Sequence, residues 1–389
     1  MNKEFQIIFE NGLVEFRQNK YTEAIQHFKS AYQLSLQKNN FSGAGAALNK
    51  IGEAYMLSQQ FRLALNHLLK AFVLRSDHND KVGLLETLNS LGEIHYYLDS
   101  FNKSMYYYEK CLSQSRVLKN DYYIALALKN VGWIKFKTDK SFSSISSDYA
   151  IAVSIAEEIQ EKRLLLSCYD NLGDLHFSRK DFVSSLQFFN KMLHISNATE
   201  YTHMTIRALK NIGNVHREMG DLKAAESFLI RAMNLAKEKN ILAMLRDCSY
   251  DKALLHEQKK EFRVAYSHFK NYHGYAMEIE KEKSSRKMAD ALQIETSGSP
   301  MNIHESLKIP NLVGITEEFR NSLLKKYPQL TPRQVEIASL IRNGISSKEI
   351  SILLNIEVDS INKQRARIRK SFDINRTQNL MTFLQKFAI

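Results

Sequence analysis

The chain has 389 residues, which is enough for two or three domains of ordinary size. Its four prolines and 14 glycines are too few for a loop-rich all-β protein or for long disordered tracts. Lysine and arginine number 54 against 42 acidic residues, and the resulting net charge of +12 favours an anionic partner.

The sequence shows no targeting or disulfide signal. Three cysteines lie far apart, at spacings that fit neither a disulfide framework nor a zinc motif. The first residues, MNKEFQIIFENGLVEF, carry charges throughout, unlike a signal peptide. No run of about 18 apolar residues predicts a membrane-spanning helix. We therefore expect a soluble cytoplasmic protein with no membrane contact.

A repeat of about 40 residues organises residues 1–283. Large apolar residues follow the opening small residue by nine and 16 positions, and small residues follow it by 12 and 19, as at Phe61, Leu68, Ala64 and Ala71. This spacing predicts two amphipathic helices per unit. Seven units predict an all-α fold built as one continuous right-handed helical solenoid. The opening residues are Gly12, Gly52, Gly92, Gly132, Gly173, Gly213 and Ala253.

The order Gly, aromatic, Ala, Phe, Ala in each unit resembles tetratricopeptide repeats. The usual repeat of that family has about 34 residues, so each helix here should gain most of a turn. The resemblance implies a binding scaffold whose concave groove is lined by the first helix of each pair. It implies no catalysis.

Polar residues near each opening glycine are candidates for binding a peptide or protein partner in that groove. Asparagine recurs among them, and its amide can both donate to and accept from an extended peptide backbone. Their partly basic character suits a peptide with acidic groups or a free carboxylate. Two alternatives are polar solvation with hydrogen bonds between helices, and a solenoid that only dimerises. The candidates are Asn49, Asn89, Lys129, Asn130, Asn171, Arg207, Lys210, Asn211 and Asn214.

Four histidines recur three positions after the opening residue, at His95, His176, His216 and His256. Residues one repeat apart are separated by roughly 10 Å, too far to share one metal ion. We therefore predict that these rings pack between helices, and we expect neither a metal nor a cofactor.

Residues 284–315 are predicted to hold a helix that caps the solenoid, followed by a linker. The charged stretch MEIEKEKSSRKMADALQIE continues the helical pattern, with a short coiled coil as the alternative. The stretch after Thr296 contains glycine, serine and two of the four prolines, as linkers do.

Residues 316–389 break the repeat and concentrate positive charge. Residues 325–389 contain 12 basic and five acidic residues, a net of +7. Thr331 and Pro332 can begin a helix that Gly344 ends, and Ser346 or Ser347 can begin the next. A turn at residues 355–358 then leads to a basic helix at about 359–372, and a last helix follows at about 377–387. This is the helix-turn-helix layout.

The basic helix is predicted to enter the major groove of duplex DNA. At about 100° per residue, Ile361, Ile368 and Phe372 fall on one side, and the polar residues fall on the other. Residues on the exposed face should contact bases, and flanking cations should contact phosphates. A basic solvated helix is the alternative. The base contacts are Asn362, Lys363, Ala366 and Arg367; the phosphate contacts are Ser347, Lys348, Arg365, Arg369, Lys370 and Arg376.

The segment LTPRQVEIASLIRNGISSKEISILLNIEVDSINKQRARIRKSF, residues 330–372, resembles the LuxR-type helix-turn-helix regulators. Two positions depart from the family pattern: Gln334 replaces a frequent Glu, and Gln364 replaces a common His. The resemblance implies a transcription regulator of the subgroup in which a tetratricopeptide solenoid precedes this domain. We also predict a homodimer on DNA, because a single helix-turn-helix contacts few base pairs. The resemblance suggests that the last helix contributes through Leu380, Phe383, Leu384 and Phe387. Some of these residues must pack on the core of their own domain, so the solenoid or the helix at 275–295 is the alternative contact.

Three classes of function remain to be weighed. A transcription regulator accounts for both parts of the chain. A protein-interaction scaffold that only tethers itself to nucleic acid without sequence preference is the alternative. An enzyme is not supported, because the sequence contains no P-loop, no GxSxG motif and no dinucleotide fingerprint.

Overall fold

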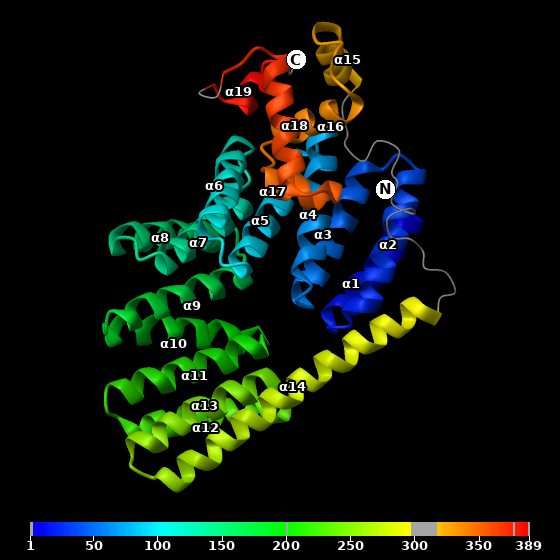
Figure 1. The fold of residues 1–389 in the computed structure, drawn as a ribbon. Helices are drawn as coiled ribbons and strands as arrows, with labels where there is room; N and C mark the ends of the chain where they lie inside the picture. The colour runs from blue at the N-terminus through cyan, green and yellow to red at the C-terminus, as the bar shows by residue number, and fades with distance from the viewer. Residues whose placement is uncertain (1–2, 200, 297–316, 376–377, 388–389) are drawn as a thin grey trace. The chain divides into compact units, whose positions relative to one another are not determined.

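The computed structural model describes residues 3–199, 201–296, 317–375 and 378–387, and the secondary structure within these residues is helical (Figure 1). Seven consecutive helix pairs make a tetratricopeptide-type helical solenoid, as the repeat predicted. The pairs are α1 Lys3–Arg17 and α2 Tyr21–Gln37, α3 Phe41–Leu57 and α4 Phe61–Asp77, α5 Lys81–Tyr97 and α6 Phe101–Val117, α7 Asp121–Lys137 and α8 Phe142–Glu158, α9 Lys162–Ser178 and α10 Phe182–Ala198, α11 Thr202–Glu218 and α12 Leu222–Glu238, and α13 Leu242–Gln258 and α14 Phe262–Thr296.

Regular turns set the 40-residue period. Most solenoid helices are 17 residues long, and a residue with positive φ lies in nearly every turn between them, as at Asn39 and Asn79. The next residue then often caps the following helix: Asn40 accepts from the Gly43 amide and Asp80 from the Gly83 amide. Asparagine and aspartate tolerate the left-handed conformation and cap helices well, so the sequence specifies both the turn and the restart.

The opening glycines allow the two helices of a pair to approach closely. A methyl group at Gly52 would lie 2.6 Å from Leu68 Cγ, and one at Gly132 would lie 2.8 Å from Tyr149 Cε1. Real side chains do not approach so closely, and therefore a larger residue would push the helices apart. Each opening glycine in fact faces the large residue that follows it by 16 or 17 positions.

The chain divides into two compact units. The first contains residues 1–114 and 298–389, which are the first three repeats together with the C-terminal helices. The second contains residues 115–297, with repeats four to seven. Large buried side chains fill both, including Phe28 and Leu68 in the first and Tyr149 and Phe189 in the second. Within the described residues, no helix combines the length and the apolar character that crossing a membrane requires.

The expected capping helix is continuous with the last repeat, because α14 extends to Thr296. The predicted linker after it lies outside the described residues. Five short helices follow: α15 Glu317–Lys326, α16 Pro332–Arg342, α17 Ser347–Leu354, α18 Val358–Ser371 and α19 Leu380–Gln385.

The helix ends in this C-terminal part follow the predicted signals. Thr331 begins α16 with a capping box to Gln334, and Gly344, at φ 86°, follows its end. Ser346, of the two serines considered, caps α17 and forms a second capping box with Glu349. The last helix is shorter than predicted, because the Asn379 side chain accepts from two backbone amides and begins α19 there.

Candidate nucleic-acid interface and solenoid groove

Helices α17 and α18 are joined by a short turn, and α18 has an exposed basic face. Asn355, at φ 50°, ends α17 in the left-handed conformation, and α18 begins three residues later. Ile361, Ile368 and Phe372 are buried on one side of α18, as the helical angle predicted. The opposite side is exposed, and it presents Asn362, Lys363, Ala366, Arg367 and Lys370.

The predicted phosphate contacts differ in their surroundings. Lys348 is exposed at the start of α17, and Ser347 is half-buried beside it. Arg365 is half-buried, and burial together with the nearby charge of Arg369 lowers its pKa. Arg376 lies outside the described residues.

Arg369 forms hydrogen bonds within its own part of the chain, a role that the sequence did not indicate. Its Nη1 donates to the carbonyl oxygens of Asn375 at 2.9 Å and Gln378 at 2.8 Å. The guanidinium therefore ties the loop between α18 and α19 to the end of α18. This use of the donors reduces what remains for a phosphate.

The two departures from the LuxR-type pattern contact each other. Gln334 Nε2 donates to Gln364 Oε1 at 3.4 Å, and Gln334 Oε1 accepts from the Thr331 amide at 2.9 Å. Gln334 therefore keeps the capping box and also fixes the side of α18 that carries Gln364. The contact joins α16 to α18.

An aromatic cluster packs around the four apolar residues that were expected to support dimerisation. Leu380 and Leu384 are buried, and Phe383 lies 5.1 Å from the Phe372 ring. The Phe387 ring lies 5.9 Å from that of Tyr327. These four apolar residues of the last helix and its end therefore contribute to the core of their own domain.

The start of α17 also contacts the second and third repeats, within the first unit. The Glu349 side chain is buried, and its Oε1 accepts from Tyr107 Oη at 2.9 Å and lies 3.1 Å from His95 Nε2 and 3.2 Å from Lys103 Nζ. Burial alone would raise the pKa of Glu349, but hydrogen bonds from His95 and Ser346 and the charge of Lys103 outweigh it. The pKa is therefore held well below its usual value.

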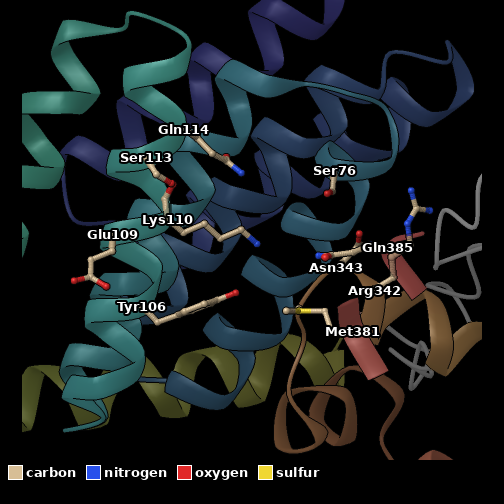
Figure 2. A pocket seen from close by; sticks show the side chains of 11 residues that line it. Ser76, Tyr106, Glu109, Lys110, Ser113, Gln114, Arg342, Asn343, Met381 and Gln385 are labelled. Atoms are coloured by element: carbon tan, nitrogen blue, oxygen red, sulfur yellow. The ribbon is translucent and has the colours of Figure 1, made fainter. Parts of the chain in front are cut away.

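A shallow pocket of about 570 Å³ lies between α6 and the C-terminal helices (Figure 2). Tyr106 and Lys110 of α6 line one side, and Asn343 and Met381 of the C-terminal helices line the other. Close by, burial raises the pKa of Asp77 to about 7, although a hydrogen bond with Asn343 and the charge of Arg342 act in the opposite direction.

In the second unit, the predicted groove cations pair with acids one repeat away. Arg207 Nε lies 3.0 Å from Asp170 Oδ2, and Asn211 Nδ2 donates to Asp170 Oδ1 at 3.2 Å. Lys210 Nζ lies 3.7 Å from Asp251 Oδ2. The result is a ladder of alternating charge along the first helices α9, α11 and α13. Sequence reasoning did not single out Asp170 or Asp251, although each lies about 40 residues from its partner.

Asp174 is the acid of this groove without a counterion. Among the described residues it makes no ion pair, and it lies one turn after Asp170 on α9. Burial, together with the negative charge of Asp170, raises the pKa of Asp174 to about 6, against the charges of Arg207, Lys210 and Lys137. A cationic group placed beside it would favour its charged form.

The asparagines do not behave as one set. Asn49 is completely buried, and its amide donates to Glu53 at 2.7 Å and to Ser90 at 3.2 Å. Asn49 therefore does not line the groove, because its place between α3 and α5 is already filled. Asn130 is 9% exposed, and the remaining predicted positions, Asn89, Asn171, Asn211 and Asn214, are half-buried.

The recurring histidines pack between helices, as predicted. His95 stacks on Tyr107 at 5.4 Å, His216 on Phe228 at 5.5 Å and His256 on His268 at 5.2 Å. His176 lies 5.3 Å from the Phe188 ring. Within the described ranges, no group of three acidic, histidine or cysteine residues is arranged to hold a metal.

Comparisons with known proteins agree with this fold. A family model for the tetratricopeptide repeat matches residues 164–238. The tetrathionate response regulatory protein TtrR of Salmonella typhimurium is 29% identical over 107 residues, which cover 28% of this chain and 51% of that protein. The chain thus spans about half the length of this curated relative.

Solved structures of Rap proteins have a similar solenoid. RapI in its apo form has a TM-score of 0.57 at 14% identity, over 72% of this chain and 99% of that one. Aspartyl phosphate phosphatase F of Bacillus subtilis has a TM-score of 0.56 at 18% identity, over 70% of each chain. A Rap protein complexed with competence and sporulation factor has a TM-score of 0.55 at 16% identity, over 72% and 76%. At these identities the likeness concerns the fold alone.

Proposed function

We propose that the protein is a transcription regulator whose residues 316–389 form a LuxR-type domain that binds duplex DNA. The observation that carries this proposal is the exposed face of α18, where Asn362, Lys363, Ala366 and Arg367 stand together at the helix-turn-helix position that enters the major groove. The similarity to a protein named as a response regulator supports it.

The exposed residues divide into two roles. Asn362 and Lys363 can bond base edges, and the small Ala366 lets the helix approach the groove floor. Lys348, Arg367 and Lys370 are exposed cations, and within the described part of the chain none of them forms an ion pair. They are therefore available for an anion, and phosphates supply most of the affinity in such complexes.

The solenoid is proposed to bind a peptide or a protein partner in the groove of repeats four to seven and so to control the DNA-binding domain. One neighbour in fold is a Rap protein complexed with competence and sporulation factor. The geometry refines the expected ligand. Because Arg207 and Lys210 already face Asp170 and Asp251, the unmatched charge is that of Asp174. A partner segment with a cationic group beside Asp174 therefore fits this groove better than a segment whose only recognised group is a carboxylate.

A homodimer on DNA is also proposed, since one helix-turn-helix contacts few base pairs and two half-sites are usually combined. The aromatic cluster uses the predicted seam of α19, so the contact between copies must involve other surfaces as well. Light scattering of the protein, free and with DNA, measures this directly. A monomeric mass in both states would exclude the dimer.

The alternative is an interaction scaffold that tethers itself to nucleic acid without sequence preference, and in neither case do we expect catalysis. The deciding experiment begins with genomic footprinting of the full chain to find a bound sequence. Fluorescence anisotropy then compares that duplex with a scrambled duplex at two salt concentrations. A regulator should bind its own sequence at least tenfold more tightly at the higher salt, whereas a tether should bind both equally and lose both with salt.

A further inference from the structure

The C-terminal domain is attached to the solenoid through the start of α17. The two carboxylate oxygens of Glu349 have different partners. Oε2 accepts from the Ser346 amide at 2.9 Å and so completes the cap of its own helix. Oε1 faces the third repeat, where Tyr107, His95 and Lys103 converge on it. We call this arrangement the Glu349 clamp.

Neighbouring contacts extend the clamp along the same face. Lys103 Nζ also donates to Ser346 Oγ at 3.2 Å, and Asn66 Nδ2 of α4 donates to the Ile352 carbonyl at 3.0 Å. At the other end of the domain, Met381 lines the pocket that Tyr106 and Lys110 close from the solenoid side (Figure 2). The domain is thus held through α17 and, just after α16, through Asn343, which hydrogen-bonds Asp77.

The clamped surface is one that DNA binding requires. In a helix-turn-helix complex the first helix crosses the phosphate backbone, and the N-terminus of a helix is a natural site for a phosphate. Ser347 and Lys348 occupy that end of α17, directly beside Ser346, which Lys103 contacts. The base-contacting face of α18 stays exposed, but Lys103, Tyr107 and His95 lie against the end of α17 that would face a phosphate of a bound duplex.

We propose that the Glu349 clamp is autoinhibitory: the third repeat holds the DNA-binding domain docked, and a duplex binds after the domain leaves the solenoid. This inference rests on the proposed DNA-binding function. Release keeps the domain folded, because the Ser346–Glu349 capping box belongs to α17 alone. Release exposes a hydroxyl, an imidazole and an ammonium group on the solenoid side, and water can solvate all three.

The test changes the solenoid side only, so that no predicted DNA contact is altered. Tyr107→Phe removes the hydroxyl and keeps the ring, and Lys103→Glu places a negative charge beside Glu349. The double variant of the full chain should bind duplex DNA about tenfold more tightly than the parent, the effect of losing one hydrogen bond to a charged group. Lys140→Glu, an exposed site in the second unit, makes the same charge change and is the matched control. If only the added negative charge mattered, both variants would bind DNA more weakly than the parent. Tighter binding by the double variant alone would therefore support the clamp.

A distance measurement tests docking without DNA. Spin labels at Arg62→Cys on α4 and Asn321→Cys on α15 use exposed positions, and the three native cysteines are buried. We expect one distance in the parent, and a broad, longer distribution in the double variant and in the parent with DNA. Equal DNA affinity with an unchanged distance would overturn the clamp and leave the proposed function standing. Absence of DNA binding in every variant would overturn the proposed function itself.

Discussion

The half-buried carboxyl of Asp174 should make the second unit less stable as pH rises. Burial, assisted by Asp170, raises its pKa from 3.8 to about 6 in the folded chain. The folded state therefore holds this proton more tightly than the unfolded state. The stabilising effect is complete below about pH 4 and is lost as pH rises through about 6. A shift of roughly two pKa units corresponds to at most about 3 kcal/mol.

The substitution Asp174→Asn removes this titration and keeps the size of the side chain. At pH 7.5 the variant should melt several degrees higher than the parent, up to about 10 °C for a unit of this size, and at pH 4.5 the difference should fall to about a third of that. Circular dichroism of the full chain measures both transitions. Glu238→Gln, at an exposed carboxylate with 67% of its side chain accessible, is the control and should change neither. An equal difference between variant and parent at the two pH values would refute the argument from burial.

Three further predictions concern the proposed sites. Asn362→Ala and Lys363→Ala should each reduce discrimination between the bound and a scrambled duplex by ~1–3 kcal/mol, measured by anisotropy; an equal loss on both duplexes would reassign them to phosphates. Arg369→Ala should lower the melting temperature of the C-terminal domain, because it frees the loop before α19, besides weakening DNA binding; unchanged melting would leave only the phosphate role. Replacing Asn171 and Asn211 together with Ala should reduce recovery of a groove partner, and full recovery with an intact fold would remove the groove from the mechanism.

The sequence predicted the solenoid because its packing depends on residue size at fixed intervals. Two helices that approach at Gly52 need a small residue there, because Leu68 of the second helix fills the space beside it. The same reasoning located the helix ends near Thr331 and Ser346, since caps depend on local chemistry. Features of this kind depend on residues that are close together in the sequence, and they can therefore be predicted from it.

Contacts between repeats could not be assigned in the same way. The recurring asparagines fitted a peptide ladder and hydrogen bonds between helices equally well, and the structure shows a hydrogen bond to a neighbouring helix from Asn49 and from Asn211. Each partner lies 41 positions away, a spacing at which many polar residues compete. The sequence did not single out Glu349, which in the structure belongs to the capping box of its own helix. Its second set of partners comes from residues more than 240 positions earlier.

The positions of groove and clamp constrain how a ligand could control DNA binding. The charge ladder lies on repeats five to seven, whereas Tyr107 and His95 belong to the third repeat, so the fourth repeat separates them in sequence. A ligand bound at the ladder must therefore act through the fourth repeat to reach the clamp. It must also bind the released form more tightly, typically by ~1–3 kcal/mol, which is comparable to one hydrogen bond to a charged group. A groove ligand should therefore raise DNA affinity in the parent and have no further effect once Lys103→Glu and Tyr107→Phe have opened the clamp. Anisotropy titrations with and without the ligand measure this, and an equal gain in both proteins would show that the ligand acts elsewhere.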